Sequence, residues 1–497
     1  MRVTNWRWIP VALFLALFLH GATIGLTDDE AYYWVLAQHP ALGYAFHPPA
    51  VAWSIAASQW LLGWLFGTHS IALVRLPAAF YSAVILGVGM LWMRDAGAPN
   101  RGMGRGAAGL LSFAGLFGAS WMMVPDLPLF AGWMIAYAAT WRICFGHARR
   151  PAFMALSFGL ALALLSKYSG ILAAVSAVIA LKFWAHSKIQ KRGYLAVAVG
   201  VSVALVPILI WNSNHEWSSI LYQIRDRHSD AQFSWVRYAR FWAVEALLAG
   251  PVLLAFALTL LLRTVRRKHH QEHSRVTRYA LAWAAPAGLV FCLQPAWSDF
   301  KPHWAFIVWL PAALELGWAW SHGKEVKWAK AQAVYGFSFI AIALLLCRIP
   351  LTSWVPDILT GVEIEPKLDV TNDLYGWNYL RTFIISWAGT EALKLPMVGS
   401  RYQTAAQAAF AMGEGSRVTF LPRDNKELDE WPDLGITDHQ GPVWPRLLAP
   451  ILFVADNRYS AGPGFASSKC DKLGRMETRR GIYLAKWIDV WRCSPVY

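Results

Sequence analysis

The chain has 497 residues, of which 56% are hydrophobic and 15% charged, and it contains 29 tryptophans. This composition excludes an ordinary soluble enzyme and is typical of a protein that crosses a membrane many times. The formal net charge of +15 does not indicate a nucleic-acid binder, because the lysines and arginines fall between apolar stretches and form no single basic face.

The first apolar stretch covers residues 8–26 and follows Arg2 and Arg7. A cleaved signal peptide has this general pattern, so the two possibilities must be weighed. No small-residue cleavage site precedes the acidic residues at 28–30, and further apolar stretches follow. We therefore interpret residues 8–26 as a retained first transmembrane helix.

A membrane-spanning helix needs roughly 20 apolar residues, and about eleven stretches approach that length. They begin near Trp8, Ile71, Gly106, Leu127, Ala152, Gly170, Tyr194, Tyr238, Tyr279, Trp304 and Ala331. Residues 49–66 form a doubtful extra candidate, since they carry Ser54, Ser58 and Gln59, and we predict an interfacial helix there. The expected fold is a mainly α-helical polytopic membrane protein.

The distribution of lysine and arginine predicts a cytoplasmic N-terminus, because cytoplasmic loops are enriched in these residues. With this orientation most ionisable candidates for chemistry lie in the outer loops. These residues are Asp28, Asp29, Glu30, Asp126, Lys167, Glu216, Arg225, Asp226, Arg227, Asp299, Lys301 and His303.

After the last stretch the composition becomes mixed, and we predict a small extracytoplasmic α/β domain over residues 349–497, following a transmembrane domain over 1–348. The first outer loop of the transmembrane domain is 27–69. In the C-terminal domain, helix-like periodicity occurs over 402–412 and strand-like patterns over 417–421, 451–454 and 481–491.

Two of the five cysteines, Cys470 and Cys493, lie in this C-terminal domain. If the domain is extracytoplasmic, these two residues are candidates for a disulfide. A pair of unlinked thiols is the alternative.

The sequence Thr27-Asp28-Asp29-Glu30 matches a capping box, in which Thr27 and Glu30 satisfy backbone groups at a helix start. Acidic residues in a first helical turn also favour the helix dipole. On this interpretation the cluster only begins an interfacial helix. Because a cap does not require two consecutive aspartates, we instead expect Asp29 to be a general base for an acceptor hydroxyl.

A second carboxylate, Asp126, lies between Pro125 and Pro128 at the outer end of a stretch. It is a candidate helix cap on one interpretation. On the other it orients a substrate or, together with Asp29, holds a divalent cation.

Four basic or hydrogen-bonding side chains on the same predicted side form a candidate phosphate site: Lys167, Arg225, Lys301 and His303. Positive groups of this kind stabilise a phosphate leaving group. Snorkelling to the interface is the alternative for Lys167, and contact with lipid headgroups is the alternative for each of the four.

An ordered set of motifs over roughly the first 310 residues resembles bacterial membrane glycosyltransferases of the GT-C superfamily. Within it, the chain is similar to the protein O-mannosyltransferase-like family that includes the lipid A aminoarabinose transferase and the lipopolysaccharide galacturonosyltransferases. The motifs are Asp29-Glu30-Ala31-Tyr32-Tyr33-Trp34, His47-Pro48-Pro49 with Val51-Ala52-Trp53, Pro125-Asp126-Leu127-Pro128-Leu129, Ser166-Lys167-Tyr168, Trp211-Asn212 with His215-Glu216-Trp217, and His303-Trp304.

The resemblance implies an enzyme that moves one sugar from a polyprenyl-phosphate carrier to a periplasmic acceptor: lipid A or lipopolysaccharide, another envelope glycan, or a protein. The catalytic acids implied are Asp29 with Glu30, and Asp126 in a second loop. The carrier phosphate would be held by Lys167, Arg225 and His303. We expect the substrate site to include Asp28, Tyr32, Tyr33, His47 and Tyr168.

We expect a monomer in the bacterial inner membrane, in contact with lipid and without nucleic acid. A divalent metal ion is the one cofactor to consider. Many relatives carry an acidic residue directly before the His-Pro-Pro element, where this chain has Phe46. In the aminoarabinose branch a carboxylate near this position contributes to a metal site, so Phe46 argues against a metal and against equating the chain with that enzyme.

Two other functions are alternatives to sugar transfer. A transporter or lipid-carrier flippase without chemistry predicts ionisable groups near the middle of the membrane and internally symmetric halves. Charged groups gathered at one face disfavour it. A polymerase or ligase that moves whole glycans is the second rival, although the Asp29-Glu30 loop favours transfer of a single sugar.

Overall fold

The computed structural model describes residues 5–146, 148–225, 231–266, 271–362, 364–413, 415–420, 437–438, 446–465 and 468–496. The chain folds into two compact units. Unit 1 comprises Met1–Leu19, Ala41–Val51 and Pro77–Ala343, whereas unit 2 comprises His20–Pro40, Ala52–Leu76 and Leu344–Tyr497. Unit 2 therefore joins much of the first predicted outer loop to the C-terminal region.

Unit 1 is built from helices. Those with most or all of their residues in this unit are α1 (Ile9–Gly21), α4 (Ile71–Asp95), α5 (Met103–Leu111), α6 (Ala114–Gly118), α7 (Asp126–Phe145), α8 (Arg150–Ser166), α9 (Ile171–Trp184), α10 (Ser187–Asn214), α11 (Ser218–Ile224), α12 (Trp235–Leu248), α13 (Pro251–Val265), α14 (Gln271–Phe291), α15 (Phe306–Ser321) and α16 (Val326–Leu346). Helix α3 (Ala50–Phe66) begins in unit 1 and continues into unit 2.

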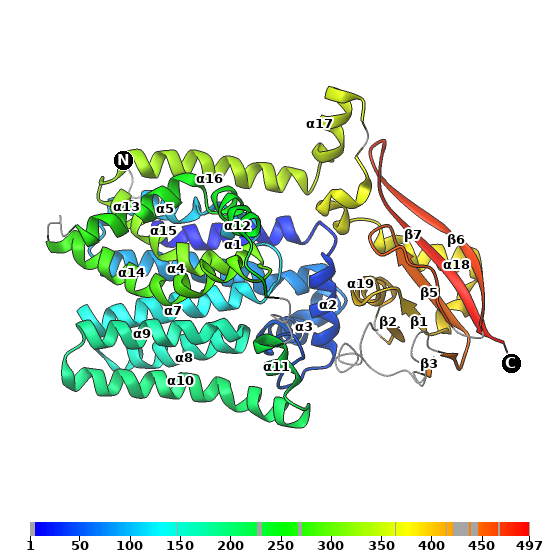
Figure 1. The fold of residues 1–497 in the computed structure, drawn as a ribbon, viewed down its shortest axis with the longest axis horizontal. Helices are drawn as coiled ribbons and strands as arrows, with labels where there is room; N and C mark the ends of the chain where they lie inside the picture. Colours follow the sequence, from blue (N-terminus) through cyan, green and yellow to red (C-terminus); the bar gives the residue numbers. More distant parts are fainter. Residues whose placement is uncertain are drawn as a thin grey trace. The chain divides into compact units, whose positions relative to one another are not determined.

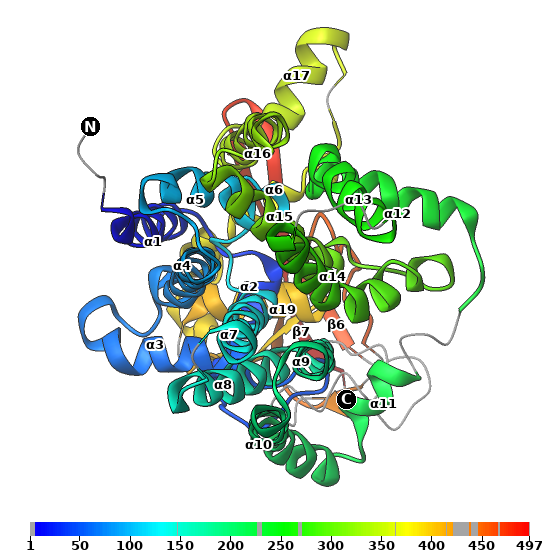
Figure 2. The same ribbon diagram turned by 90° about the vertical axis from the view of Figure 1, so that its left-hand side faces the viewer.

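The helices α4, α7, α8, α9 and α10 run roughly parallel to one another, as the end-on view in Figure 2 shows. Helices α7 and α8 approach very closely through Gly132 and Gly159. A Cβ atom added to Gly132 would lie 2.6 Å from the carbonyl oxygen of Gly159. Small residues permit this contact between apolar helices, and it fixes α7 against α8.

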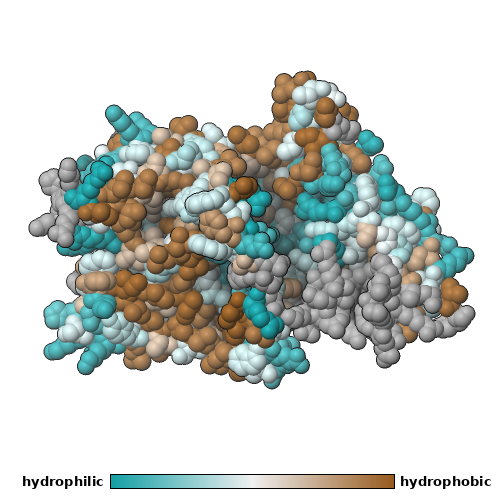
Figure 3. Space-filling model, viewed as in Figure 1, coloured by the Kyte–Doolittle hydropathy of each residue, from teal (hydrophilic) through white to brown (hydrophobic). Residues whose placement is uncertain are grey.

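The face of unit 1 seen in Figure 3 carries a broad apolar area. On α10, for example, exposed aliphatic residues recur every three or four positions, at Leu195, Val199, Val203, Val206 and Ile210. One face of that helix is therefore apolar and outward, as expected for contact with lipid. Among the described residues, four helices are long and apolar enough to cross a membrane, or five if the bent pair α12 and α13 counts as one span. The expected count of eleven spans stays a prediction.

Two predicted stretches differ from single straight helices. The stretch predicted from Gly106 is divided at Ser112-Phe113 into the short helices α5 and α6, and Phe113 has an extended backbone. The stretch predicted from Tyr238 bends by 106° between α12 and α13. The bend lies at Gly250-Pro251, where Gly250 has a φ of +98° and Pro251 begins the second helix.

Unit 2 combines helices with a five-stranded sheet of order β2-β1-β5-β7-β6 (Figure 1). Its further elements are α2 (Asp28–Gln38), α17 (Leu351–Thr360), α18 (Leu380–Ala388), α19 (Tyr402–Met412), β1 (Met397–Gly399), β2 (Val418–Phe420), β3 (Thr437–Asp438), β4 (Arg446–Leu447), β5 (Ile451–Asp456), β6 (Ser468–Arg480) and β7 (Tyr483–Pro495). Strand β1 pairs in parallel with β2 and β5, whereas β7 pairs antiparallel with β5 and β6.

The C-terminal α/β architecture predicted from the sequence is confirmed, as is the mainly helical class of the rest. The helix expected over 402–412 is α19, and the three expected strands are β2, β5 and β7. Strand β6 was not predicted from the sequence, and its solvent-exposed positions carry many charged residues. Cys470 and Cys493 are opposite one another on β6 and β7 and are joined by a disulfide.

The first turn of α2 is tied by a buried ion pair to Arg75 in the first residues of α4, which belong to unit 2. The predicted capping box is present, since Thr27 Oγ1 accepts from the amide of Glu30 at 3.3 Å and a Glu30 carboxylate oxygen accepts from the amide of Thr27 at 3.0 Å. The Arg75 guanidinium then donates to both Glu30 carboxylate oxygens, at 2.7 and 2.6 Å. Its remaining donors reach the carbonyl oxygens of Gly21, Ile24 and Gly25.

Replacing Arg75 with methionine should lower the free energy of unfolding by about 3–5 kcal/mol, because Glu30 would remain as a buried charge without its partner. Both side chains are at most 1% exposed, so solvent cannot compensate. Denaturant unfolding of the detergent-solubilised protein measures the change.

The double variant Arg75→Met/Glu30→Gln is the matched control. It removes both charges and should regain much of the lost stability. If the double variant were as unstable as Arg75→Met, the ion pair would not be the source of the effect.

Candidate functional site

Three of the predicted site residues of unit 1 converge on one buried carboxylate. Asp126 is the first residue of α7, and the Lys167 ammonium donates to its two carboxylate oxygens at 2.8 and 3.0 Å. His303 Nε2 lies 3.6 Å from the same carboxylate. His47, in the same unit, also stabilises the negative charge of Asp126. The structure therefore brings an acid, an ammonium and two imidazoles together.

The packing of α7 against α8 explains how residues far apart in sequence meet here. Lys167 follows the last residue of α8 in an extended conformation, at the end of α8 that neighbours the start of α7. The contact between Gly132 and Gly159 keeps these two helices close. His303 lies in the short 3-10 helix Pro302–Ala305, which directly precedes α15. Three helix ends thus contribute one side chain each.

Two other predicted residues of unit 1 lie at its surface. Arg225 follows the end of α11, and Lys301 precedes the 3-10 helix that carries His303; both are exposed. Tyr168 directly follows Lys167 and is partly buried. Its hydroxyl shares a 2.7 Å hydrogen bond with Ser219 Oγ. The roles assigned to these residues stay predictions.

In unit 2 the three consecutive acids Asp28, Asp29 and Glu30 have different surroundings. Glu30 is fully buried against Arg75, and Asp28 is 7% exposed. Asp29 is exposed. The catalytic role expected for Asp29 and Glu30 and the substrate role expected for Asp28 stay predictions, but the structure assigns Asp28 and Glu30 clear packing roles.

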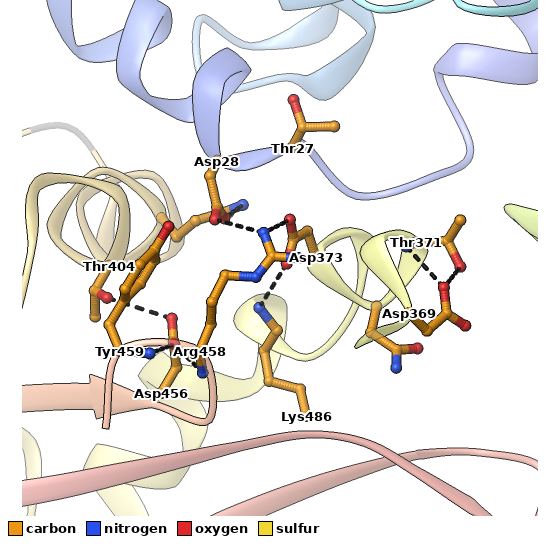
Figure 4. Close-up of polar contacts among 12 residues, drawn as sticks. Thr27, Asp28, Asp369, Thr371, Asp373, Thr404, Asp456, Arg458, Tyr459 and Lys486 are labelled. Atoms are coloured by element: carbon orange, nitrogen blue, oxygen red, sulfur yellow. Dashed lines mark hydrogen bonds and ion pairs between the residues drawn. The ribbon is translucent and has the colours of Figure 1, made fainter. Parts of the chain in front are cut away.

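Asp28 belongs to a network of charged side chains drawn from distant parts of unit 2 (Figure 4). Its carboxylate accepts a 3.1 Å hydrogen bond from Gln407 on α19, and Arg458 Nη1 lies 3.6 Å away. The same Arg458 nitrogen donates to Asp373, and Lys486 Nζ on β7 lies 3.7 Å from Asp373. Gln407 also donates to the Leu26 carbonyl oxygen at 2.9 Å, so the start of α2 is fixed by side chain and backbone.

A further carboxylate, Asp456 at the end of β5, shapes the loop that presents Arg458. Asp456 Oδ1 accepts from the amides of Arg458 and Tyr459, at 2.9 and 3.0 Å. Asp456 Oδ2 accepts from Thr404 Oγ1 at 3.3 Å. The loop is therefore held in one conformation from both sides.

Burial and the mutual repulsion of the carboxylates dominate the electrostatics of this network. Burial, and after it the nearby Asp28, raise the pKa of Asp373 to about 7, although Lys486 and Arg458 oppose this rise. Burial also raises the pKa of Asp28, against the effect of Lys486. Asp28 and Asp373 therefore hold protons at a pH where exposed carboxyls have lost them.

Tyr32 and Tyr33, both expected at the substrate site, are buried in unit 2. The two rings contact each other with centroids 5.5 Å apart, and Tyr32 contacts Tyr402 of α19 at 5.4 Å. Each tyrosine is 5% exposed. In this structure they pack α2 against α19, and their substrate role stays a prediction.

The partners that fix α2 were not predicted from the sequence: Arg75, Asp373, Gln407, Arg458 and Lys486. For Arg75 a signal existed, since it is an isolated cation in the apolar sequence Ile71-Ala72-Leu73-Val74-Arg75-Leu76. Such residues generally have a partner or a function. No comparable signal marks Arg458 or Asp373, which lie in polar sequence.

The described residues fit a metal poorly. Among them, no group of three or more His, Cys, Asp or Glu side chains is placed to hold a metal ion. Asp126 is instead neutralised by the Lys167 ammonium, and a neighbouring cation disfavours a second one. Directly before the His-Pro-Pro element, the apolar Phe46 ring contacts Tyr222 with centroids 4.9 Å apart. We therefore derive no step through a metal.

The raised pKa of Asp373 predicts a specific pH dependence of stability. The folded pKa of about 7 exceeds the ordinary value of 3.8. Protonated Asp373 therefore contributes stability that is fully present below pH 3.8 and is lost as the pH rises to about 7. In the variant Asp373→Asn this decline should largely disappear, as measured by the thermal midpoint between pH 4 and pH 8.

Asp471→Asn serves as the control, since the Asp471 side chain is 70% exposed in the same unit. This control should keep the pH profile of the original protein. An Asp373→Asn variant with an unchanged profile would contradict the assignment.

Comparison with known proteins gives one curated relative and a shared fold. No known protein-family profile matches the chain. The lipid A galacturonosyltransferase RgtD of Rhizobium johnstonii is 27% identical over 315 residues, and the match covers 61% of each chain, which is less than two thirds of the relative's length.

Two crystal structures of ArnT from Cupriavidus metallidurans are similar along nearly the whole chain. The apo structure has a TM-score of 0.63 at 14% identity and covers 99% of this chain and 98% of its own. The structure bound to undecaprenyl phosphate has a TM-score of 0.63 at 15% identity and covers 98% of both chains. At these identities the likeness shows the fold. Together with the sequence match to RgtD, it places the chain in the GT-C superfamily of membrane glycosyltransferases.

Proposed function

We propose that this protein transfers a single sugar from a polyprenyl-phosphate carrier to lipid A or another envelope acceptor at the periplasmic face of the bacterial inner membrane. The observation that carries the proposal is the cluster of Lys167 and His303 around Asp126. Such a cluster provides an oriented ammonium at helix ends, and the His303 side chain beside it is 44% exposed.

The cluster supports phosphate chemistry because of how Lys167 is held. A lysine side chain is flexible, and two hydrogen bonds to Asp126 fix its ammonium in one place. A fixed cation stabilises negative charge that develops on a leaving group, without the cost of reorganising at that moment. As the bond between the sugar C1 and the carrier phosphate breaks, the phosphate gains this charge.

The acceptor side of the reaction needs a base when the acceptor is a hydroxyl. In the proposed step the acceptor oxygen bonds to C1, the carrier phosphate leaves with the electron pair, and the hydroxyl proton passes to Asp29. Asp29 is exposed at the first turn of α2, so an acceptor hydroxyl can reach its carboxylate. If the acceptor is an ionised phosphate, no base is required, and Asp29 would orient it instead.

The donor and acceptor classes rest on the relatives. RgtD is a lipid A galacturonosyltransferase, and ArnT has been crystallised with undecaprenyl phosphate. These two names support a polyprenyl-phosphate donor and a lipid A acceptor for this chain. The apolar surface of unit 1 supports a membrane location, which both lipid substrates require.

Deleting the gene should remove the mass of one sugar from lipid A, core oligosaccharide or another envelope glycan, as read by mass spectrometry. The original protein should restore the mass. Asp29→Asn should reduce transfer by roughly 10²-fold or more, because the acceptor proton would have no base.

Glu391→Gln is the matched control, because Glu391 is an exposed acid whose side chain is 79% accessible in unit 2. It should restore transfer fully. Full restoration by Asp29→Asn would remove Asp29 from the mechanism. An envelope in which no glycan loses a single sugar would reject the proposed transfer itself.

Lys167→Gln should lower kcat by about 10²-fold while changing the KM for the acceptor little, because Lys167 acts on charge that develops only during bond breaking. Lys167→Arg keeps the charge and should retain more activity than Lys167→Gln. Steady-state kinetics in membranes supplied with donor and acceptor measure both.

Lys182→Gln changes an exposed lysine at the end of α9 and should leave kcat unaltered. If Lys167→Gln raised only the KM, or if Lys167→Arg were as inactive as Lys167→Gln, the role in stabilising the leaving group would be wrong.

A further inference from the structure

Helix α17 in unit 2 exposes its apolar residues. Trp354 and Val355 are each 46% exposed, Ile358 is 64% exposed and Leu359 is 75% exposed. In a helix on the surface of a soluble domain, side chains of this kind normally face the core. An exposed apolar face of this size indicates that something apolar covers it.

Three polar residues of α17, Thr352, Ser353 and Asp357, face the rest of unit 2. Asp357 accepts a 2.7 Å hydrogen bond from the Tyr483 hydroxyl on β7. Thr352 donates to Asp369, and Ser353 is 4% exposed. The helix is thus oriented with its polar side inward and its apolar side outward, the reverse of the usual arrangement.

The tip of the β6–β7 hairpin extends the same apolar surface. Ile482 lies in the turn between the two strands and is 74% exposed. An open hollow of about 320 Å³ lies between Trp354 and Ile482, with Ile349 and Pro350 in its lining. Figure 1 shows the hairpin beside α17, and Figure 3 shows apolar side chains over α17. Two separate segments therefore contribute to one apolar surface.

The chain itself restricts where α17 can be. Helix α16 ends at Leu346 and is one of the helices long and apolar enough to cross a membrane. Helix α17 begins at Leu351, so the connecting residues allow at most about 18 Å between the two ends. A helix so close to the end of a membrane span lies near the bilayer surface, where tryptophan is also enriched.

An arginine at the hairpin tip carries a positive charge, which is attracted to anionic lipid headgroups. Arg479 donates to the carbonyl oxygen of Ile482 at 2.9 Å, and its side chain is 58% exposed although Glu477 lies 3.7 Å from the guanidinium. An exposed guanidinium beside an apolar tip can bind a headgroup phosphate while the tip enters the acyl region.

We infer that α17 and Ile482 dock on the lipid bilayer, with acyl chains covering Trp354, Ile358, Leu359 and Ile482 and with Arg479 at the headgroups. This surface anchors the C-terminal region to the membrane at a second place besides α16. The inference is independent of the proposed sugar transfer, because it rests only on exposure, polarity and the position of α17 in the chain.

Fluorescence quenching in the full-length protein tests this surface. The free cysteines Cys144, Cys292 and Cys347 are replaced by alanine, and the disulfide is kept. Single variants Leu359→Cys and Ile482→Cys carry an environment-sensitive nitrobenzoxadiazole label, and Glu391→Cys carries it as the exposed control in unit 2. Each protein is reconstituted in nanodiscs of phosphatidylethanolamine and phosphatidylglycerol.

Lipids brominated at carbons 6 and 7 should quench the labels at 359 and 482 by about two-fold or more, since docked helices enter the acyl boundary by roughly 5–10 Å. Aqueous iodide should quench them little. At position 391 iodide should quench and brominated lipid should not.

Two results would overturn the inference. Quenching by iodide at 359 and 482 as strong as at 391 means that the surface lies in water. Protection from both quenchers at 359 and 482 means that protein, such as a second copy of this chain, covers it.

Discussion

The buried ion pair of Arg75 and Glu30 fixes the first turn of α2, which carries the candidate base Asp29. The Arg75 guanidinium donates hydrogen bonds to both carboxylate oxygens of Glu30 and to three carbonyl oxygens of the segment before α2. These hydrogen bonds replace those to water that the oxygens lose on burial. Asp28 is fixed in a similar way by Gln407 and Arg458. Glu30 and Asp28 therefore fix α2 in place, and Asp29 is exposed.

The local features around this pair could be predicted from the sequence. The capping box of Thr27 and Glu30 depends on residues three positions apart, and such patterns are readable directly. The helix Tyr402–Met412 and the strand Ile451–Asp456 were predicted for the same reason, because their periodicity is local. Local rules of this kind describe much of the secondary structure of both units.

The partners of the buried charges could not be predicted, because they are set by the tertiary fold. Arg75 lies 45 residues from Glu30, and Gln407 lies 379 residues from Asp28. No rule of sequence spacing connects such positions. The bend at Gly250-Pro251 could be predicted only in part. The glycine and the proline can be read from the sequence, but the angle of 106° depends on the tertiary fold. The edge strand β6 was missed because its charged residues mask the alternation that marks a strand.

The environments of the two principal candidate acids support different tasks in the proposed reaction. Asp126 is buried and accepts two hydrogen bonds from an ammonium, which stabilises its ionised form and leaves it with little tendency to take up a proton. A proton acceptor needs an oxygen that an incoming hydroxyl can reach, and Asp29 is exposed. Asp126 therefore suits the positioning of Lys167, and Asp29 suits proton transfer.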